Sequence, residues 1–164
     1  MLELVISGGQ TGVDQAALKA AKTLGIKTGG TAPMFYRTEK GHEGELLKRY
    51  GLIELTVYDY ASRTEKNVAE SDATLRIARH FQSPGEQCTL RALRARGKIF
   101  RDVKEERYSC IGRDKAEQIS QWLLENNVKV LNVAGNSERT APGITQNAFK
   151  FLCILFEHHL KSVS

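Results

Sequence analysis

Short apolar runs alternate with amphipathic runs along the whole chain. The apolar, β-branched runs predict strands at residues 2–6, 26–31, 52–58, 73–78, 98–103 and 128–134. The amphipathic runs predict helices at residues 15–24, 62–70, 86–96, 115–126 and 142–160, with a further helical turn at residues 45–50. Strands and helices that alternate at these lengths predict an α/β fold, in which helices cover both faces of a parallel sheet. Ligands of such folds bind at the carboxyl ends of the strands.

The same pattern predicts several local features. Ser62 or Thr64 should cap the helix that begins near residue 62. The polar stretch 36–44 should form an exposed loop, and Trp122 should lie in the core. The adjacent histidines at 158–159 should lie at a frayed, solvated helix end.

The last helix carries more apolar residues than one buried face needs. The side chains expected to face the core are Phe149, Leu152, Cys153 and Phe156. The other apolar side chains of this helix are Phe151, Ile154 and Leu155. A helix that is apolar on all sides must be buried, so these residues predict a homo-oligomer.

A glycine-rich turn, Ser7-Gly8-Gly9-Gln10-Thr11-Gly12-Val13-Asp14, joins the first strand to the first helix. This arrangement aims backbone N–H groups and a helix N-terminus at an anion. The three glycines accept positive φ and let a phosphate approach the backbone, and Gln10 and Thr11 can add side-chain hydrogen bonds. The turn is neither a G-x-G-x-x-G fingerprint nor a Walker A loop. It predicts a phosphorylated ligand, with a tight β–α turn that binds nothing as the alternative.

Small or hydrogen-bonding residues also accompany other predicted strands. They are Gly30, Asn67, Asp72, Gly85, Thr89, Asn132, Gly135, Asn136, Glu138, Pro142 and Gly143. Pro142 and Gly143 open the last helix and suit a second N-terminus that accepts an anion. Because such loops gather at one edge of a parallel sheet, we expect one ligand-binding site there. Its predicted residues are these eleven together with Ser7, Gly8, Gly9, Gln10, Thr11, Gly12, Asp14 and Arg37.

Composition limits the class of protein. The 164 residues are 41% hydrophobic with a formal net charge of +5, which suits one soluble domain. No apolar run approaches the ~20 residues needed to cross a bilayer, and a strand from residue 2 leaves no room for a leader peptide. Cys88, Cys110 and Cys153 are odd in number and far apart. This spacing predicts a reducing cytoplasm, with neither disulfides nor a metal site.

Much of the positive charge lies between Arg91 and Lys104. Such a cluster can bind nucleic acid by releasing counterions. The acidic residues Asp102, Glu105 and Glu106 in or beside this stretch, and an aromatic content of 7%, instead favour a solvated surface. The charge is also sufficient to steer a small anionic ligand.

Several motifs in register resemble one family. They are Ser7–Asp14 with Ala16-Ala17-Leu18, Gly29-Gly30 with Pro33, Arg63–Val68, Ser71–Leu75, Asn132–Gly135 and Pro142–Ile144. In these motifs the chain resembles the proteins described as molybdenum cofactor carriers, the circularly permuted YpsA-related branch of the SLOG superfamily. The resemblance covers nearly the whole chain and implies a Rossmann-like fold with a single domain over residues 1–164. It also implies a pocket for a nucleotide or for a pterin-like phosphorylated ligand such as the molybdenum cofactor.

The chain departs from the family pattern at two places. Pro84-Gly85-Glu86 stands where the family usually has Gly-Gly-Thr, although Gly85 and the later Thr89 are kept. Asn136-Ser137-Glu138 stands where Pro-Arg-Glu is usual, and Arg139 is displaced by one position. A cation expected beside the ligand is therefore absent or moved, which leaves the identity of the ligand open.

Three functions fit these residues. A carrier, sensor or sequestering protein for a nucleotide-like or molybdopterin-like ligand needs only the loops. A nucleotide phosphoribohydrolase, the activity of the related LOG enzymes, needs a carboxylate and a cation that holds phosphate. The candidates are Asp14, Asp72 and Glu138 for the carboxylate, and Arg37 or Arg139 for the cation. The LOG signature Pro-Gly-Gly-x-Gly-Thr-x-x-Glu is absent, which favours binding. The glycine-rich turn is also similar to a segment of DprA, so single-stranded DNA binding is a third, less favoured reading.

Overall fold

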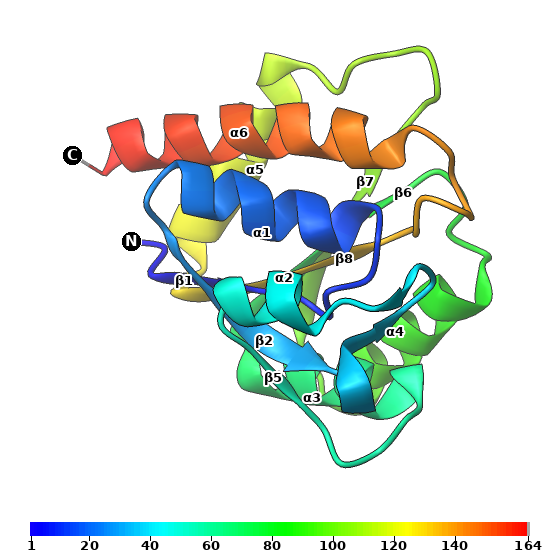
Figure 1. The fold of residues 1–164 in the computed structure, drawn as a ribbon. Coiled ribbons are helices and arrows are strands. Elements are labelled where there is room, and N and C mark those ends of the chain that lie inside the picture. The colour runs from blue at the N-terminus through cyan, green and yellow to red at the C-terminus, as the bar shows by residue number, and fades with distance from the viewer. Residues whose placement is uncertain (164) are drawn as a thin grey trace.

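A six-stranded parallel sheet between helical layers forms the centre of the protein, as the computed structural model of residues 1–163 shows (Figure 1). The strands lie in the order β5-β2-β1-β8-β6-β7, and every neighbouring pair is parallel. Their bounds are β1 (Leu4–Ile6), β2 (Lys27–Ala32), β5 (Leu52–Glu54), β6 (Ala73–Ala78), β7 (Ile99–Lys104) and β8 (Val130–Gly135). The α/β, Rossmann-like parallel sheet expected from the sequence is confirmed.

Helices cover both faces of this sheet (Figure 1). One layer contains α1 (Val13–Thr23), α5 (Arg113–Glu125) and α6 (Ile144–Ser162), and the other contains α3 (Tyr60–Glu70) and α4 (Pro84–Ala95). A short helix α2 (Gly44–Arg49), a 3₁₀ turn η1 (Met34–Tyr36) and a hairpin of β3 (Arg37–Thr38) and β4 (Gly41–His42) lie between β2 and β5 in the chain. No helix in the described range is long and apolar enough to span a membrane.

The position of β8 determines where the loops meet. Although it is the last strand, it inserts between β1 and β6 and pairs with both. In this register Asn132 lies opposite Ile6 on one side and opposite Thr74 on the other. The segments that follow β1, β6 and β8 therefore leave the sheet side by side at its carboxyl edge.

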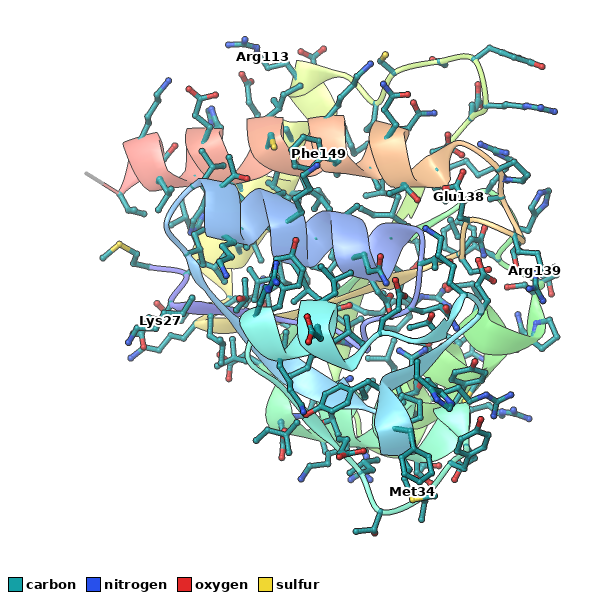
Figure 2. All side chains as sticks on the ribbon, in the orientation of Figure 1. Lys27, Met34, Arg113, Glu138, Arg139 and Phe149 are labelled. Carbon is teal, nitrogen blue, oxygen red and sulfur yellow. The ribbon has the colours of Figure 1, made fainter. Side chains whose placement is uncertain are left out.

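The core includes a wider face of α6 than the sequence predicted. Leu152 and Phe156 are buried as expected, but Phe151 and Leu155, which were expected on the outside, are buried as well. Phe149 and Cys153, expected inside, are only partly buried. The reason is that α6 packs against both α1 and α5, so its buried arc spans two neighbours. Figure 2 shows Phe149 at the edge of α6 that faces α1.

These positions remove two residues from the evidence for a homo-oligomer, which stays a prediction. A second correction concerns the end of α6. His159 is buried rather than solvated, and its Nδ1 lies 3.1 Å from the Ser120 hydroxyl of α5. Trp122 lies in the core, as predicted.

Two local predictions in the first half of the chain are also corrected. The stretch 36–44 is an ordered turn and hairpin in which Tyr36 is buried against Leu47 and Leu52, because its ring completes a small core cluster. The helix α3 begins two residues earlier than expected. Asp59 caps it by accepting the Ser62 N–H at 2.7 Å, so neither Ser62 nor Thr64 is the cap.

Candidate ligand-binding cavity

A cavity of about 290 Å³ opens at the carboxyl edge of the sheet. Its walls come from the glycine-rich turn after β1, from α3, from the start of α4 and from the end of β8. Nine of the residues predicted for the site line it: Gly8, Gln10, Asp14, Asn67, Gly85, Thr89, Asn132, Gly135 and Asn136. The strand order explains why these distant segments share one wall.

The glycine-rich turn is held mainly by contacts within the protein. Gly12 has φ +85°, and a Cβ there would lie 2.3 Å from the backbone oxygen of Asn136. The Gln10 N–H donates to the Asp14 carboxylate, and the Thr11 N–H donates to Gln10 Oε1. Much of the hydrogen-bonding capacity of the turn is therefore used to shape the cavity wall.

Asp14 and Arg63 form a buried ion pair beside this turn. The Arg63 Nη1 lies 2.9 Å from Asp14 Oδ2, and only 13% and 4% of the two side chains are exposed. Burial raises the pKa of Asp14, and the neighbouring guanidinium opposes that rise. The guanidinium lies directly on Gly8, where a Cβ would come within 1.4 Å of Nη1. Its Nε is buried and has no hydrogen-bond partner among residues 1–163, so a side chain that lines the cavity keeps one unsatisfied donor.

The N-terminus of α4 opens on the cavity. Ser83 is the N-cap and Pro84 follows, but no side chain of the described chain caps the first turn. A Cβ at Gly85 would have no neighbour within 4 Å, so the first turn is accessible. Unpaired N–H groups and the helix dipole at such an end favour an anion.

Asn136 holds this helix end in place. Its Oδ1 accepts the N–H groups of Arg79 and His80 at 2.9 and 2.8 Å. Its Nδ2 donates to the His80 carbonyl and to the Ser83 hydroxyl. One side chain after β8 thus positions the loop that joins β6 to α4.

Glu86, in the first turn of α4, is a residue of the cavity that was not predicted from the sequence. Its side chain is 2% exposed, and its carboxylate accepts no hydrogen bond from any residue in the described range. The nearest cation is Arg76, whose Nη1 lies 3.6 Å from Oε2 and whose guanidinium forms two hydrogen bonds with Asp102. Burial raises the pKa of Glu86 to about 7, although Arg76 opposes this. The feature of the sequence that could have indicated Glu86 is Arg76, a charged residue within the mainly apolar strand β6.

Asn67 and Asn132 line the cavity and also join its walls. The Asn67 side chain forms two hydrogen bonds with the backbone of Thr31, at 2.9 and 3.1 Å. Asn132 Nδ2 donates to the Thr74 hydroxyl on the adjacent strand. Gly135 is required by close packing, since a Cβ there would lie 2.0 Å from the Ile77 carbonyl.

Asp72 is not brought to the cavity, which corrects its assignment. It precedes β6 and therefore lies at the amino edge of the sheet, opposite the cavity. Its Oδ2 accepts the N–H groups of Lys129 and Val130 at 2.9 and 2.8 Å. The carboxylate thus fixes the start of β8 and is remote from any chemistry in the cavity.

Glu138 and the start of α6 also lie outside the cavity lining. The Glu138 carboxylate accepts the N–H groups of Gly143 and Thr145 and the Thr145 hydroxyl. The N-terminus beside Pro142 and Gly143, expected to accept an anion, therefore already holds a carboxylate of the chain. Figure 2 shows Glu138 and Arg139 on the connection between β8 and α6.

The two cations proposed for phosphate have partners elsewhere. Arg37 lies over the rings of Tyr58 and Tyr60, at 4.4 and 4.7 Å. Arg139 donates through its backbone and side chain to Glu39, at 2.9 and 3.2 Å. Arg63, which no step of the sequence analysis selected for the ligand, is the cation that lines the cavity.

The remaining predicted residues support the wall from behind. The Ser7 hydroxyl donates to the Val133 carbonyl, and Thr11 donates to Glu39. Gly9 packs on Leu47 and Leu52 (closest approach of a Cβ 2.8 Å), and Gly30 packs on the Ser7 carbonyl (2.2 Å). Cys88 also lines the cavity, and no cluster of three or more metal-ligating side chains occurs in residues 1–163.

A parallel sheet with a cavity and an uncapped helix N-terminus at its carboxyl edge is typical of Rossmann-like domains that bind small molecules. The chain belongs to the circularly permutated YpsA SLOG family, whose model matches residues 5–156. The family resemblance seen in the motifs is thereby confirmed.

A solved structure agrees with this assignment. The crystal structure of the "Putative molybdenum carrier protein" from Syntrophus aciditrophicus SB matches with a TM-score of 0.85 and 34% identity, over 94% of each chain. A metagenomic short-chain oxidoreductase in complex with NADP matches with a TM-score of 0.37 and 13% identity, over 96% of this chain and 90% of that chain. A TM-score of 0.37 does not establish a shared fold. No curated protein matches the chain significantly.

Proposed function

We propose that the cavity binds the phosphate of a nucleotide-like or molybdopterin-like small molecule, and that the protein is a carrier, sensor or sequestering protein for it. The observation that carries the proposal is the uncapped N-terminus of α4, which opens on the same cavity that Arg63, with its unpartnered Nε, also lines. In this arrangement the phosphate lies at Ser83–Gly85. The rest of the ligand extends toward Gly8, Gln10 and Asn132 on the opposite wall.

The size of the cavity supports a small ligand. A volume of about 290 Å³ lies at the lower end of the range of small-molecule sites, about 300–1,000 Å³. A mononucleotide or a pterin suits such a volume better than a dinucleotide. The name of the Syntrophus protein agrees with a molybdenum-containing ligand, and the molybdenum cofactor is therefore one of the candidates.

The cellular setting proposed is the cytoplasm, which the three free cysteines support. We also propose a homo-oligomer. Its remaining support is the partly buried apolar residues Phe149, Cys153 and Ile154 on α6, and light scattering of the purified protein tests it. Nucleic acid remains the less favoured partner, and salt-dependent retention on single-stranded DNA would revive it.

A nucleotide N-glycosidic hydrolase is the second candidate, because two carboxylates, Asp14 and Glu86, line the cavity. A carboxyl group with a pKa of about 7, such as Glu86, can act as a general acid at neutral pH. Incubation with nucleoside monophosphates and chromatography of the products separates this activity from simple binding. Intact recovery of the nucleotide supports the carrier, and release of the base supports the hydrolase.

The proposed phosphate position is tested by adding a side chain at Gly85. Gly85→Val places its side chain in open space at the first turn of α4, so the fold tolerates it while the anion site narrows. Native mass spectrometry first identifies any ligand that co-purifies, and calorimetry with mononucleotides and molybdate then gives affinities. We expect Gly85→Val to weaken phosphate-dependent binding about tenfold or more.

Gly112→Val is the matched control. Gly112 is also an open glycine at a helix start, the N-cap of α5, and it does not line the cavity. Equal affinities in wild type and Gly85→Val would exclude a phosphate at this helix end.

A further inference from the structure

Glu86 is the unexplained group of the cavity. It lies in the same turn of α4 that the proposed function assigns to phosphate. A carboxylate in a first helical turn is favoured by the helix dipole, but it competes with an external anion for the same field. In the described chain its buried Oε2 has no hydrogen-bond donor, although the side chain is only 2% exposed. Buried polar atoms normally have such partners, so burial disfavours the ionised form of Glu86.

The charges around Glu86 compensate it only in part. The groups that act on it are Arg76 from β6, Asp102 from β7, Asp14 from α1 and Arg63 from α3. Arg76 is shared between Asp102 at 2.6 Å and Glu86 at 3.6 Å, and Arg63 pairs with Asp14 at 2.9 Å. When all five groups are ionised, two cations face three carboxylates, so this end of the cavity carries one net negative charge. A phosphate placed beside it would meet a like charge at low dielectric.

We infer that Glu86 determines which charge the cavity accepts: the anion enters together with one proton, which is held on the Glu86 carboxyl group. This inference rests on the proposed phosphate site at α4. A protonated Glu86 removes the repulsion, and its O–H can donate to a phosphate oxygen. Glu86 belongs to the segment Pro84-Gly85-Glu86, where the family usually has Gly-Gly-Thr. This departure from the family pattern would therefore couple anion binding to proton uptake in this chain.

A probe whose own charge does not change isolates this coupling. The phosphate of AMP has a second pKa of about 6 and titrates in the relevant range, whereas a sulfate ester does not. We would therefore measure the affinity of the wild-type protein for adenosine 5′-sulfate between pH 6 and pH 8. A carboxyl group with a pKa of about 7 predicts an affinity about tenfold weaker at pH 8 than at pH 6.

The variant Glu86→Gln keeps the shape of the side chain and removes its titration. Its affinity for adenosine 5′-sulfate should be independent of pH, and at pH 8 it should exceed the wild-type affinity by about tenfold. Glu117→Gln is the control, because Glu117 is an exposed carboxylate on α5 that does not line the cavity. It should follow the wild-type pH profile. If Glu86→Gln fails to fold, the pH dependence of the wild-type affinity still tests the inference.

Each outcome separates the inference from the proposed function. An affinity for the sulfate ester that is constant from pH 6 to pH 8, or that rises with pH, overturns the role of Glu86 while the phosphate site stands. If neither AMP nor the sulfate ester binds at any pH, the proposed mononucleotide site falls, and the role of Glu86 falls with it. A tenfold decline that disappears in Glu86→Gln supports both.

Discussion

Replacing Gly12 by alanine should destabilise the fold, since this glycine is needed for packing rather than only for a ligand. Gly12 has φ +85° and ψ −130°, outside the left-handed helical region and close to the region that is essentially restricted to glycine, where a side chain costs about 1–3 kcal/mol. That Cβ would also lie 2.3 Å from Asn136 O and 2.8 Å from Glu138 N. Both neighbours are backbone atoms that cannot rotate away, and overpacking of this kind costs about 1–3 kcal/mol. The total expected loss is about 2–6 kcal/mol in the free energy of unfolding.

Gly25→Ala is the matched control for this prediction. Gly25 has φ +75°, close to that of Gly12, but a Cβ there meets nothing within 4 Å. It should therefore lose only the conformational part, about 1–2 kcal/mol. Urea unfolding followed by circular dichroism measures both variants, with the slope as a check on two-state behaviour.

Equal losses in the two variants would refute the packing argument. A ligand that approaches the backbone would then be the reason that position 12 requires glycine. In that case Gly12→Ala would reduce ligand affinity but would be no less stable than Gly25→Ala. A loss in Gly12→Ala that exceeds the loss in Gly25→Ala by more than about 2 kcal/mol, the largest difference that backbone conformation alone accounts for, shows instead that the turn after β1 and the segment after β8 pack together as one wall.

Three further predictions follow from single side chains. The pKa of Glu86 rises from 4.5 to about 7 in the fold, so the free energy of unfolding of the wild type should fall by about 3 kcal/mol between pH 4.5 and pH 7, relative to that of Glu86→Gln. Urea unfolding at several pH values measures this, and parallel curves of stability against pH for the two proteins would contradict the burial of this carboxyl group. Asp14→Asn should lower the free energy of unfolding by about 3 kcal/mol, because it leaves the Arg63 guanidinium buried without its partner. In the same assay Glu70→Gln, which breaks the exposed pair with Lys66, should lower it by less than about 1 kcal/mol. Glu138→Ala should lower stability by about 1 kcal/mol through loss of the α6 cap and leave nucleotide affinity unchanged in calorimetry; a tenfold loss of affinity would make Glu138 a ligand contact.

The sequence allowed the strands, the helices and the edge of the sheet at which the candidate cavity opens to be predicted. Residues 73–78 form β6 at the predicted bounds, because a short, mainly apolar run of this length is typical of a strand buried on both faces. The prediction that the glycine-rich turn lies at the candidate site also depended only on residues that are adjacent in the chain. Details that depend on a neighbour were less predictable. The α3 cap was assigned to the wrong residue. The buried face of α6 was predicted too narrow, because the sequence does not show that α6 packs against α5 as well as α1.

The candidate site shows the same division at the level of single residues. Asn67, Asn132 and Asn136 were selected by their type and by their place beside strands, and all three line the cavity. Asp72 was selected by the same reasoning, but it lies at the amino edge because it stands before its strand. Glu138 was selected as a catalytic carboxylate, but it accepts the N–H groups of Gly143 and Thr145 at the start of α6.

The local pattern of apolar, polar and glycine residues thus determined by itself the element order, the α/β class and the carboxyl edge as the place of the site. Those properties depend on residues that are close in sequence, and backbone geometry links them directly. Only the tertiary structure decided that β8 inserts between β1 and β6, and therefore that Arg63 meets Asp14 and that Glu86 lies buried beside Arg76. Burial, charge pairing and the pKa of Glu86 arise between residues far apart in the chain, and no local pattern encodes their distances.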